Sequence, residues 1–257
     1  MKIEGVIICV DYSDFLSETL SSNRSLFDKL VVVTSLTDQK TKTLCDFYNV
    51  ECVQTDVFYK GAAPFNKGLG INEGLKKLDK DGWVIHLDAD IYLPTLTRNI
   101  LEMIELDPNK IYGVDRMMCP TYEAWRQFKE NPKLTHEGWI YIHPTIFPMG
   151  VRVAAYMDHG YFPIGFFQLW HPSTSKVIFY PEGEVAADRS DVVHCKQWSR
   201  GQRELIPEII AIHLDSEDLD LKEMGKNWNG RKTKLFKLPT QGYKKSLIQK
   251  IKDYFTK

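Results

Sequence analysis

The chain has 257 residues, of which 43% are hydrophobic and 26% charged, as in a globular protein with a sizeable core. This length suits one large α/β domain, or one domain with an appendage. No stretch approaches the roughly 20 apolar residues of a membrane span, which excludes a transmembrane helix. The first apolar run is bounded by Glu4 and Asp11 and is too short for a signal peptide. The net charge of −1 points to no class of partner.

Five cysteines are spread along the chain without a close-spaced pair of the kind that binds zinc: Cys9, Cys45, Cys52, Cys119 and Cys195. Two of them, Cys9 and Cys52, lie in apolar, strand-like runs and are expected to be buried thiols. This usage favours a reducing compartment over a disulfide framework, so we expect a cytoplasmic location.

The first 115 residues alternate between short apolar runs and amphipathic segments. Ser13 is the expected cap of the first helix. Strands are predicted over residues 3–10, 29–35, 51–56, 83–90 and 110–116, and helices over 13–22, 37–50, 64–81 and 95–106. Because each strand is a continuous apolar run, the pattern predicts a mainly parallel sheet covered by helices on both faces.

The pattern changes after about residue 115, where Pro, Gly and aromatic residues become frequent. The segments "WIYIHPTIFPMG" and "GYFPIGFFQLWHP" predict irregular structure with one or two added strands. A helix is predicted over 184–198 and a strand over 208–215. The segment 243–255 predicts a final amphipathic helix with lysines outside its apolar face.

The end of the chain is strongly basic. Residues 222–257 hold 11 Lys and Arg against two acids, a charge of +9, so the remaining 221 residues carry −10. A basic tail on an acidic body can favour phosphates, an anionic membrane face or nucleic acid, and a solvated lysine-rich tail is the alternative. The final helix could lie on the inner membrane face as a peripheral contact, or pack on the domain.

Two carboxylates one residue apart, Asp88 and Asp90, end the fourth predicted strand in "GWVIHLDADIYLP". In an extended segment residues i and i+2 point the same way, so these carboxylates repel unless a positive group lies near them. Ligands of open α/β sheets bind beyond the carboxyl ends of the strands. A hard cation, Mg²⁺ or Mn²⁺, holding a diphosphate is the natural guest, and an acidic turn is the alternative.

Several segments together resemble a GT-A fold glycosyltransferase of the family-2-like kind. "VDYSDFLSETL" resembles the first nucleotide-contacting loop, and "LVVVTSLTDQKT" the second strand and its turn. "FNKGLGINEGL" resembles the helix beneath the donor diphosphate, and "HLDADIYLP" the Asp-x-Asp signature. "IIAIHLDSEDLDLKEMGKNWNGRKT" resembles a closing element of some such enzymes. The resemblance covers about residues 1–115 and 160–235.

This resemblance implies an α/β fold of the GT-A (Rossmann-like) type, with a mainly parallel sheet flanked by helices and a smaller mixed acceptor-side region. It divides the chain into a nucleotide-sugar-binding half, 1–115, an acceptor-side half of the same domain, 116–235, and a basic amphipathic tail, 236–257.

The resemblance also implies which residues bind the donor. Asp11 is expected to contact the nucleobase or ribose, with Tyr12 near the base. Lys67, Lys226 and Arg231 could add positive charge at the diphosphate. A surface helix lysine is the alternative for Lys67.

A metal site is implied by the same resemblance. Asp90 would bind the ion directly, His213 would supply the second protein ligand, and Asp88 would bind the ribose or a water on the metal. A carboxylate and a neutral imidazole leave positions open for two phosphate oxygens and water. For His213 the alternative is a core histidine at a strand end.

An inverting transferase needs a base to take the proton of the acceptor hydroxyl. The acidic candidates in "EVAADRSDVVHCKQW" are Asp188 and Asp191, and Asp191 is favoured because it directly precedes the apolar helical run. Helix capping by Ser190 and Asp188 is the alternative, and Asp158 is a third candidate base.

On the acceptor side, Gln168 could hydrogen-bond sugar hydroxyls and Trp170 could pack against sugar C–H surfaces. Ordinary core packing is the alternative reading of this aromatic stretch.

The leading hypothesis is a metal-dependent, inverting glycosyltransferase that uses a nucleotide diphosphate sugar, with UDP as the favoured nucleotide. The acceptor is expected to be a glycan or a lipid-linked sugar, or a modified base in nucleic acid bound by the basic tail. One alternative is a sugar nucleotidyltransferase, against which the lack of a Gly-rich basic loop after the first strand counts. The other is a non-catalytic sugar- or nucleic-acid-binding module.

Overall fold

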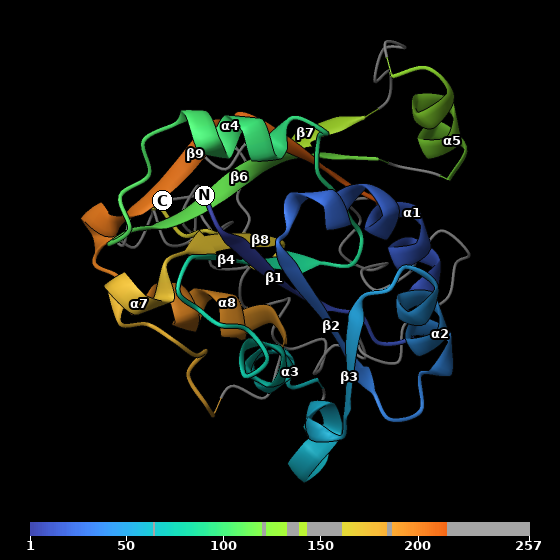
Figure 1. Cartoon of the computed structure of the whole chain (residues 1–257), viewed down its shortest axis with the longest axis horizontal. Helices are drawn as coiled ribbons and strands as arrows, with labels where there is room; N and C mark the ends of the chain where they lie inside the picture. The colour runs from blue at the N-terminus through green and yellow to red at the C-terminus, as the bar shows by residue number, and fades with distance from the viewer. Residues whose placement is uncertain (64, 120–121, 133–138, 143–160, 184–186, 215–257) are drawn as a thin grey trace, which may run out of the picture.

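The computed structural model describes residues 1–63, 65–119, 122–132, 139–142, 161–183 and 187–214. Its centre is a mixed sheet in which β3 (Glu51–Thr55), β2 (Lys29–Ser35), β1 (Ile3–Ile8) and β4 (Trp83–Asp88) lie side by side and run parallel. This half confirms the parallel arrangement predicted from the apolar runs (Figure 1).

The second half of the sheet is mixed. β8 (Phe167–Trp170) lies antiparallel between β4 and β6 (Ile111–Met118), and β9 (Arg203–His213) runs parallel to β6. Two short strands pair antiparallel at this side, β5 (Ile91–Tyr92) with β9 and β7 (Ile140–Ile142) with β6. The predicted division at residue 115 falls within β6.

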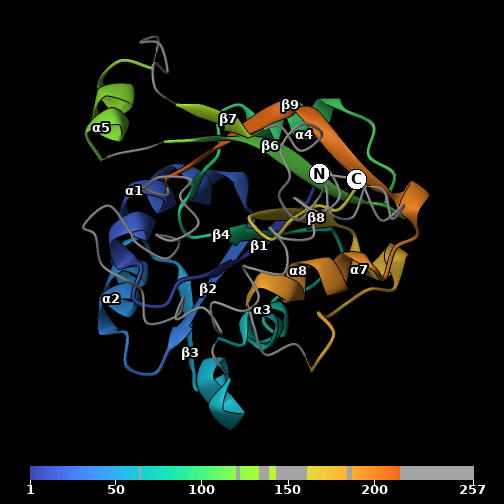
Figure 2. The same ribbon diagram turned by 180° about the vertical axis from the view of Figure 1, so that it is seen from behind.

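Helices cover both faces of the sheet. α1 (Ser13–Asn23), α2 (Gln39–Phe47) and α4 (Thr97–Met103) contribute to one apolar cluster, with Ile7 and Val32 of the sheet. On the other face, α3 (Lys67–Leu75) and α8 (Ala187–Cys195) lie side by side and pack on Val6 and Val31 (Figure 2). Neighbouring residues of one strand therefore belong to opposite cores, as the two-residue period of a strand requires.

Several short elements complete the described chain. They are α7 (Pro172–Ser175) and the 3₁₀ turns η1 (Arg24–Leu26), η2 (Val57–Ala62) and η3 (Arg200–Gln202). No helix in these described ranges is long and apolar enough to cross a membrane. The predicted final helix, 243–255, and the tail, 236–257, lie outside the described residues.

Three local predictions need correction. The irregular structure expected after residue 115 is wrong for α5 (Tyr122–Glu130), whose buried Trp125 donates its ring N–H to Glu18 of α1 at 2.9 Å. β9 begins at Arg203 rather than at 208, and the pairing shifts register around Pro207, which has no N–H for the ladder. Ser13 is the first residue of α1 rather than its cap, and the preceding Tyr12 takes the cap position without a side-chain hydrogen bond that caps the helix.

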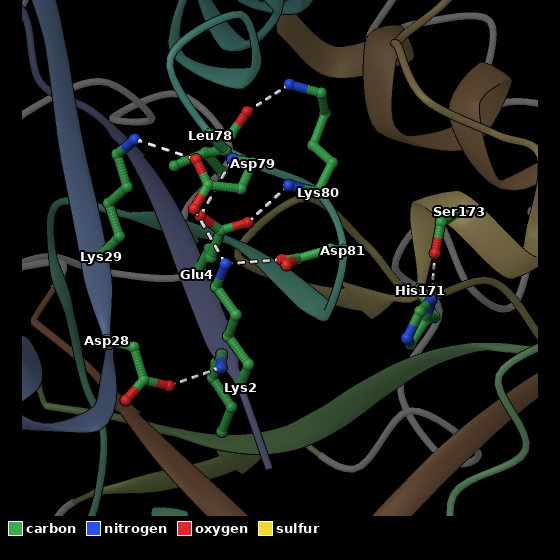
Figure 3. A network of polar contacts seen from close by, with 11 residues as sticks. Lys2, Glu4, Asp28, Lys29, Leu78, Asp79, Lys80, Asp81, His171 and Ser173 are labelled. Carbon is green, nitrogen blue, oxygen red and sulfur yellow. Dashed lines mark hydrogen bonds and ion pairs between the residues drawn. The ribbon is translucent and has the colours of Figure 1, made fainter.

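A buried carboxylate closes the end of the sheet opposite the carboxyl ends of the parallel strands. Glu4 is fully buried on β1 and accepts the backbone N–H groups of Asp79 at 3.0 Å and Lys80 at 2.7 Å (Figure 3). The surface ammonium of Lys2 pairs with Asp79 and Asp81 just outside. Lys80 has a φ of 63°, so this turn is held in a conformation that the two bonds to Glu4 stabilise.

We expect Glu4→Gln to lower the free energy of unfolding by about 2 kcal/mol, because the amide NH₂ would face one of the two backbone donors and leave it unsatisfied. Glu73→Gln is the matched control, since it removes the surface pair of Glu73 with Lys76, and we expect a change within about 0.5 kcal/mol. Urea unfolding measures both. Equal stabilities of the two variants would contradict a structural role for Glu4.

Candidate donor and metal site

Asp88 ends β4 and Asp90 follows in the turn before β5, so both lie at the carboxyl ends of the parallel strands, as predicted. The backbone N–H of Asp88 donates to Phe166 O at 3.1 Å, which joins this end of β4 to the start of β8. Residue 91 then enters β5, whose Ile91 pairs with His213 of β9. The crossing from β4 to β5 therefore carries Asp90 from the middle of the sheet to the end of β9.

Asp90 and His213 meet at that crossing. Asp90 Oδ2 lies 3.2 Å from His213 Nε2, and both side chains are largely buried, with 17% and 13% exposed. The backbone holds the pair in register, because Leu214 N–H donates to Asp90 O at 2.8 Å. On the other side of the imidazole, Arg116 of β6 places Nη1 3.2 Å from Nδ1. The fold thus brings together the two residues that were predicted as metal ligands, and their binding of a metal stays a prediction.

The charges at this site are unevenly distributed. Burial by itself raises the pKa of Asp90, but the neighbouring His213 and Lys67 outweigh burial and hold that pKa below its usual range. Burial raises the pKa of Asp88, and the charge of Asp90 raises it further against the opposing effect of Lys67. Two neighbouring carboxylates repel each other when both are ionised, and here their pKa values are shifted in opposite directions. A cation bound beside them would reduce this repulsion.

The residues present fit a divalent cation. Asp90 Oδ1 is buried and has no hydrogen-bond partner among the described residues, which is costly for a carboxylate oxygen unless a positive group approaches it. Carboxylate oxygen and imidazole nitrogen are suitable ligands for Mn²⁺. Within the described ranges, no group of three or more His, Cys, Asp and Glu converges on one point. The described chain therefore offers a two-residue site, and the participation of Asp88 stays a prediction.

Asp88 forms an ion pair with Lys67. Lys67 opens α3 directly after its cap Asn66, and its Nζ lies 2.6 Å from Asp88 Oδ1. The same ammonium donates to Gly165 O at 3.3 Å. A partly buried lysine held between a carboxylate and a backbone carbonyl differs from the surface helix lysine that was the alternative.

The first loop places Asp11 at the surface. Asp11 has a φ of 57°, and its backbone N–H donates to Asp38 Oδ2 at 2.8 Å. Tyr12 is half-buried and stacks on Phe15, with ring centroids 5.4 Å apart. The side chain of Asp11 is therefore available to a ligand, while its backbone is held by the next loop.

Asp38 and Tyr59 are neighbours of this loop that were not singled out from the sequence. Asp38 is buried, caps α2 by accepting Thr41 N–H at 3.1 Å, and also accepts the hydroxyls of Thr34 and Thr41. Burial and the charges of Asp11 and Asp38 raise the pKa of Tyr59 to about 12. The one available signal was an Asp just before a helix, the usual cap pattern.

Asp191, the favoured base, lies in α8 against the segment before β8. Its Oδ2 accepts Gly165 N–H at 2.6 Å and its Oδ1 accepts Val192 N–H at 2.7 Å. Burial raises the pKa of this carboxyl, against the opposing effects of Lys67 and the two N–H groups. Asp188 lies in the first turn of the same helix.

The predicted acceptor-side residues need correction. Gln168 and Trp170 are both fully buried on β8, and the Trp170 ring N–H donates to Val177 O at 2.9 Å. Neither can present a face to a sugar, because β8 is paired on both sides and covered by α8. Lys226, Arg231 and Asp158 lie outside the described residues.

A buried histidine on α8, His194, is expected to lower the stability of the fold at acidic pH. His194 is fully buried and stacks on Tyr180 with ring centroids 3.7 Å apart, and in the described part of the chain its Nε2 has no hydrogen-bond partner. Burial lowers the pKa of His194 to about 3, whereas an unfolded histidine titrates near 6.5. The unfolded chain therefore takes up this proton first, and stability is lost as the pH falls from about 6.5 towards 3.

We expect His194→Phe to flatten the dependence of the free energy of unfolding on pH between 6 and 4, by about 1.4 kcal/mol per pH unit at most. The pKa of buried His86 is also lowered by burial, so part of the slope remains. The control is His171→Phe, the same change at a partly exposed histidine. Urea unfolding across this pH range is the measurement, and an unchanged slope in His194→Phe would contradict the assignment.

The comparison with family models found no match, and neither did the comparison with curated proteins. Among solved structures, a mycobacterial protein superposes with a TM-score of 0.51 at 14% identity, over 88% of this chain and 70% of that chain. This likeness shows that the chain shares its mixed α/β fold with that protein.

Two further neighbours are enzymes of known activity. Glucosyl-3-phosphoglycerate synthase from Mycobacterium tuberculosis, in complex with Mn²⁺, UDP and glucosyl-3-phosphoglycerate, gives a TM-score of 0.49 at 12% identity, over 88% of this chain and 75% of that one. The 4-diphosphocytidyl-2C-methyl-D-erythritol synthase from Anaerococcus prevotii gives 0.43 at 16% identity, over 80% and 88%. At these identities the likeness concerns the fold alone.

Proposed function

We propose that the chain is a metal-dependent glycosyltransferase that moves a sugar from a nucleotide diphosphate sugar, with UDP as the favoured nucleotide, to a hydroxyl acceptor. The observation that carries this proposal is the Asp90–His213 pair, in which a buried carboxylate oxygen without a partner lies at the carboxyl end of the sheet. An unsatisfied buried carboxylate oxygen costs free energy in a packed core, whereas a bound cation would satisfy it.

Asp90 and His213 would hold the cation, Mn²⁺ or Mg²⁺, and the bound ion would neutralise charge on the diphosphate leaving group. Asp88 and Lys67 lie beside them. The ammonium of Lys67, 2.6 Å from Asp88 Oδ1, is well placed to turn towards a phosphate oxygen when the donor binds. Asp11, with its side chain at the surface and its backbone held by Asp38, would contact the ribose or base.

Asp191 would act as the base that takes the proton of the acceptor hydroxyl, with inversion at the sugar carbon. Its raised pKa brings it closer to the pH at which a carboxylate takes up a proton efficiently. The acceptor remains as predicted, a glycan or lipid-linked sugar, or a modified base in nucleic acid.

The test is the melting temperature of the wild-type chain with UDP, GDP, CDP or dTDP, each with and without Mn²⁺. We expect UDP to stabilise the protein only with the metal, by about 2.7 kcal/mol when the ligand is at 100 times its Kd. Failure of every nucleotide to stabilise it with Mn²⁺ would overturn the proposal.

The same purified protein also tests the alternative enzyme class, a sugar nucleotidyltransferase. A sugar nucleotidyltransferase would bind a nucleoside triphosphate with the metal and release pyrophosphate when given a sugar phosphate. Pyrophosphate release without any UDP release from UDP-sugars would therefore replace the proposed reaction by that one.

A further inference from the structure

A buried polar network lies beside Asp191, the proposed base. Its centre is Tyr180, a fully buried residue whose hydroxyl donates to Gln168 Oε1 and lies 3.3 Å from His86 Nδ1. His86 and Gln168 are direct cross-strand partners in β4 and β8, and both are fully buried. His86 Nε2 lies 3.5 Å from Asp88 Oδ1 but makes no hydrogen bond within the described residues.

The direction of these hydrogen bonds is set by the groups around Gln168. Its Nε2 lies 2.7 Å from Pro163 O and 3.2 Å from Asp191 O, and both are carbonyl oxygens that only the NH₂ end can face. Oε1 must therefore point to Tyr180 and accept its proton. The tyrosine oxygen then accepts from His86 Nδ1, which places the single proton of the neutral imidazole on Nδ1.

Gln168 ties together the two segments that place the Asp191 carboxylate. One is the Asp191 peptide itself, and the other is the turn after Pro163, whose Gly165 N–H donates to Asp191 Oδ2 at 2.6 Å. The approach is close: a Cβ on Gly165 would lie 2.9 Å from Asp191 Cβ. A small shift of either segment would therefore lengthen the bond that orients the carboxylate.

A second connection runs through Lys67. Its ammonium bonds both Asp88 Oδ1 at 2.6 Å and Gly165 O at 3.3 Å. The Gly165 peptide is thus held at its carbonyl by the lysine that contacts Asp88 and at its N–H by Asp191. The donor-side and acceptor-side aspartates are therefore connected through the Lys67 ammonium and the Gly165 peptide group.

We propose that Tyr180 and Gln168 are positioning residues that fix the Asp191 carboxylate relative to Asp88. The expected effect on catalysis rests on the proposed function. The placement of the Asp191 carboxylate rests on the described contacts alone. Neither residue touches a substrate, since both are fully buried. They act by holding the base at one distance from the donor site, where a displacement of about 1 Å can lower a rate on the order of 100-fold.

The test compares Tyr180→Phe with Tyr112→Phe. Tyr112 is also a buried tyrosine, and its hydroxyl accepts Asp107 N–H at 2.7 Å, outside this network. Each variant loses one hydroxyl, so a merely structural role predicts similar losses of stability and no other difference. Hydrogen exchange of the Gly165 amide, followed by NMR without any ligand, is the first readout. We expect this exchange to be at least about tenfold faster in Tyr180→Phe than in Tyr112→Phe.

The second readout is Mn²⁺-dependent release of UDP from UDP-glucose. We expect Tyr180→Phe to lower kcat by about tenfold with the Kd for UDP unchanged, and Tyr112→Phe to leave both as in the wild type. In an Asp191→Asn background the effect of Tyr180→Phe on kcat should disappear, because the two changes act on the same group.

The two readouts separate this inference from the proposed function. Equal Gly165 exchange in the two tyrosine variants would overturn the positioning role, whether or not a nucleotide binds. Fast exchange in Tyr180→Phe together with no nucleotide binding would keep the network and remove the transferase.

Discussion

Asp90→Ala is expected to abolish the Mn²⁺-dependent part of UDP binding while the protein stays folded. Asp90 is the one carboxylate in the described site that has both a facing imidazole and a buried oxygen without a partner. Residues that only support a metal ligand cost about 10–100-fold in affinity when removed, so loss of a direct ligand should cost at least about 100-fold. Isothermal titration with UDP, with and without Mn²⁺, measures the effect.

The control for this variant is Asp46→Ala, which removes a surface carboxylate paired with Lys42 on α2. It should bind UDP and Mn²⁺ as the wild type does. If Asp90→Ala bound UDP with the same dependence on Mn²⁺ as Asp46→Ala, the metal assignment would be wrong. A melting temperature close to that of the wild type is needed for the comparison, and the position of Asp90 in a loop outside β4 and β5 favours it.

Asp191→Asn is expected to lower kcat by 10²–10⁴-fold, the usual contribution of a general base, with the Kd for UDP unchanged. Asparagine keeps the size of the side chain and can still accept one of the two backbone N–H groups, but it cannot take a proton. The measurement is Mn²⁺-dependent release of UDP from UDP-glucose. The wild-type rate should also fall as the pH drops through the raised pKa of Asp191, because only the ionised carboxylate acts as a base.

Asp188→Asn in the same helix tests the competing base. A loss of kcat in Asp188→Asn that exceeds the loss in Asp191→Asn would move the catalytic role to Asp188. A full rate in both variants would show that neither carboxylate takes the proton.

The first half of the fold could be predicted from the sequence because its signals are local. β1, β2 and β4 are largely apolar runs, and α2 and α3 begin at the polar caps Asp38 and Asn66, so β1 to β4 and α1 to α3 lie close to the predicted ranges. Such strands are covered on both faces and cannot alternate, which makes them distinct from the amphipathic helices between them.

The second half could not be predicted in the same way, because its geometry depends on long-range pairing. The sequence around "GFFQLW" does not reveal that β8 enters between β4 and β6, and this insertion is what buries Gln168 and Trp170. Gln168 and Trp170, predicted to contact the acceptor, therefore lie at the centre of the sheet. The role of Gln168 then changes from contacting a sugar to holding Asp191.

The sequence by itself determined the α/β class, the order of the first elements and the position of Asp88 and Asp90 at a strand end, because periodicity and caps act over a few residues. Only the tertiary structure decided which distant side chains meet. Asp90 and His213 are neighbours because β5 pairs with β9, and Asp88 is connected to Asp191 because the Lys67 ammonium and the Gly165 peptide lie between them. Such contacts follow from strand pairing and packing, which local propensity does not encode.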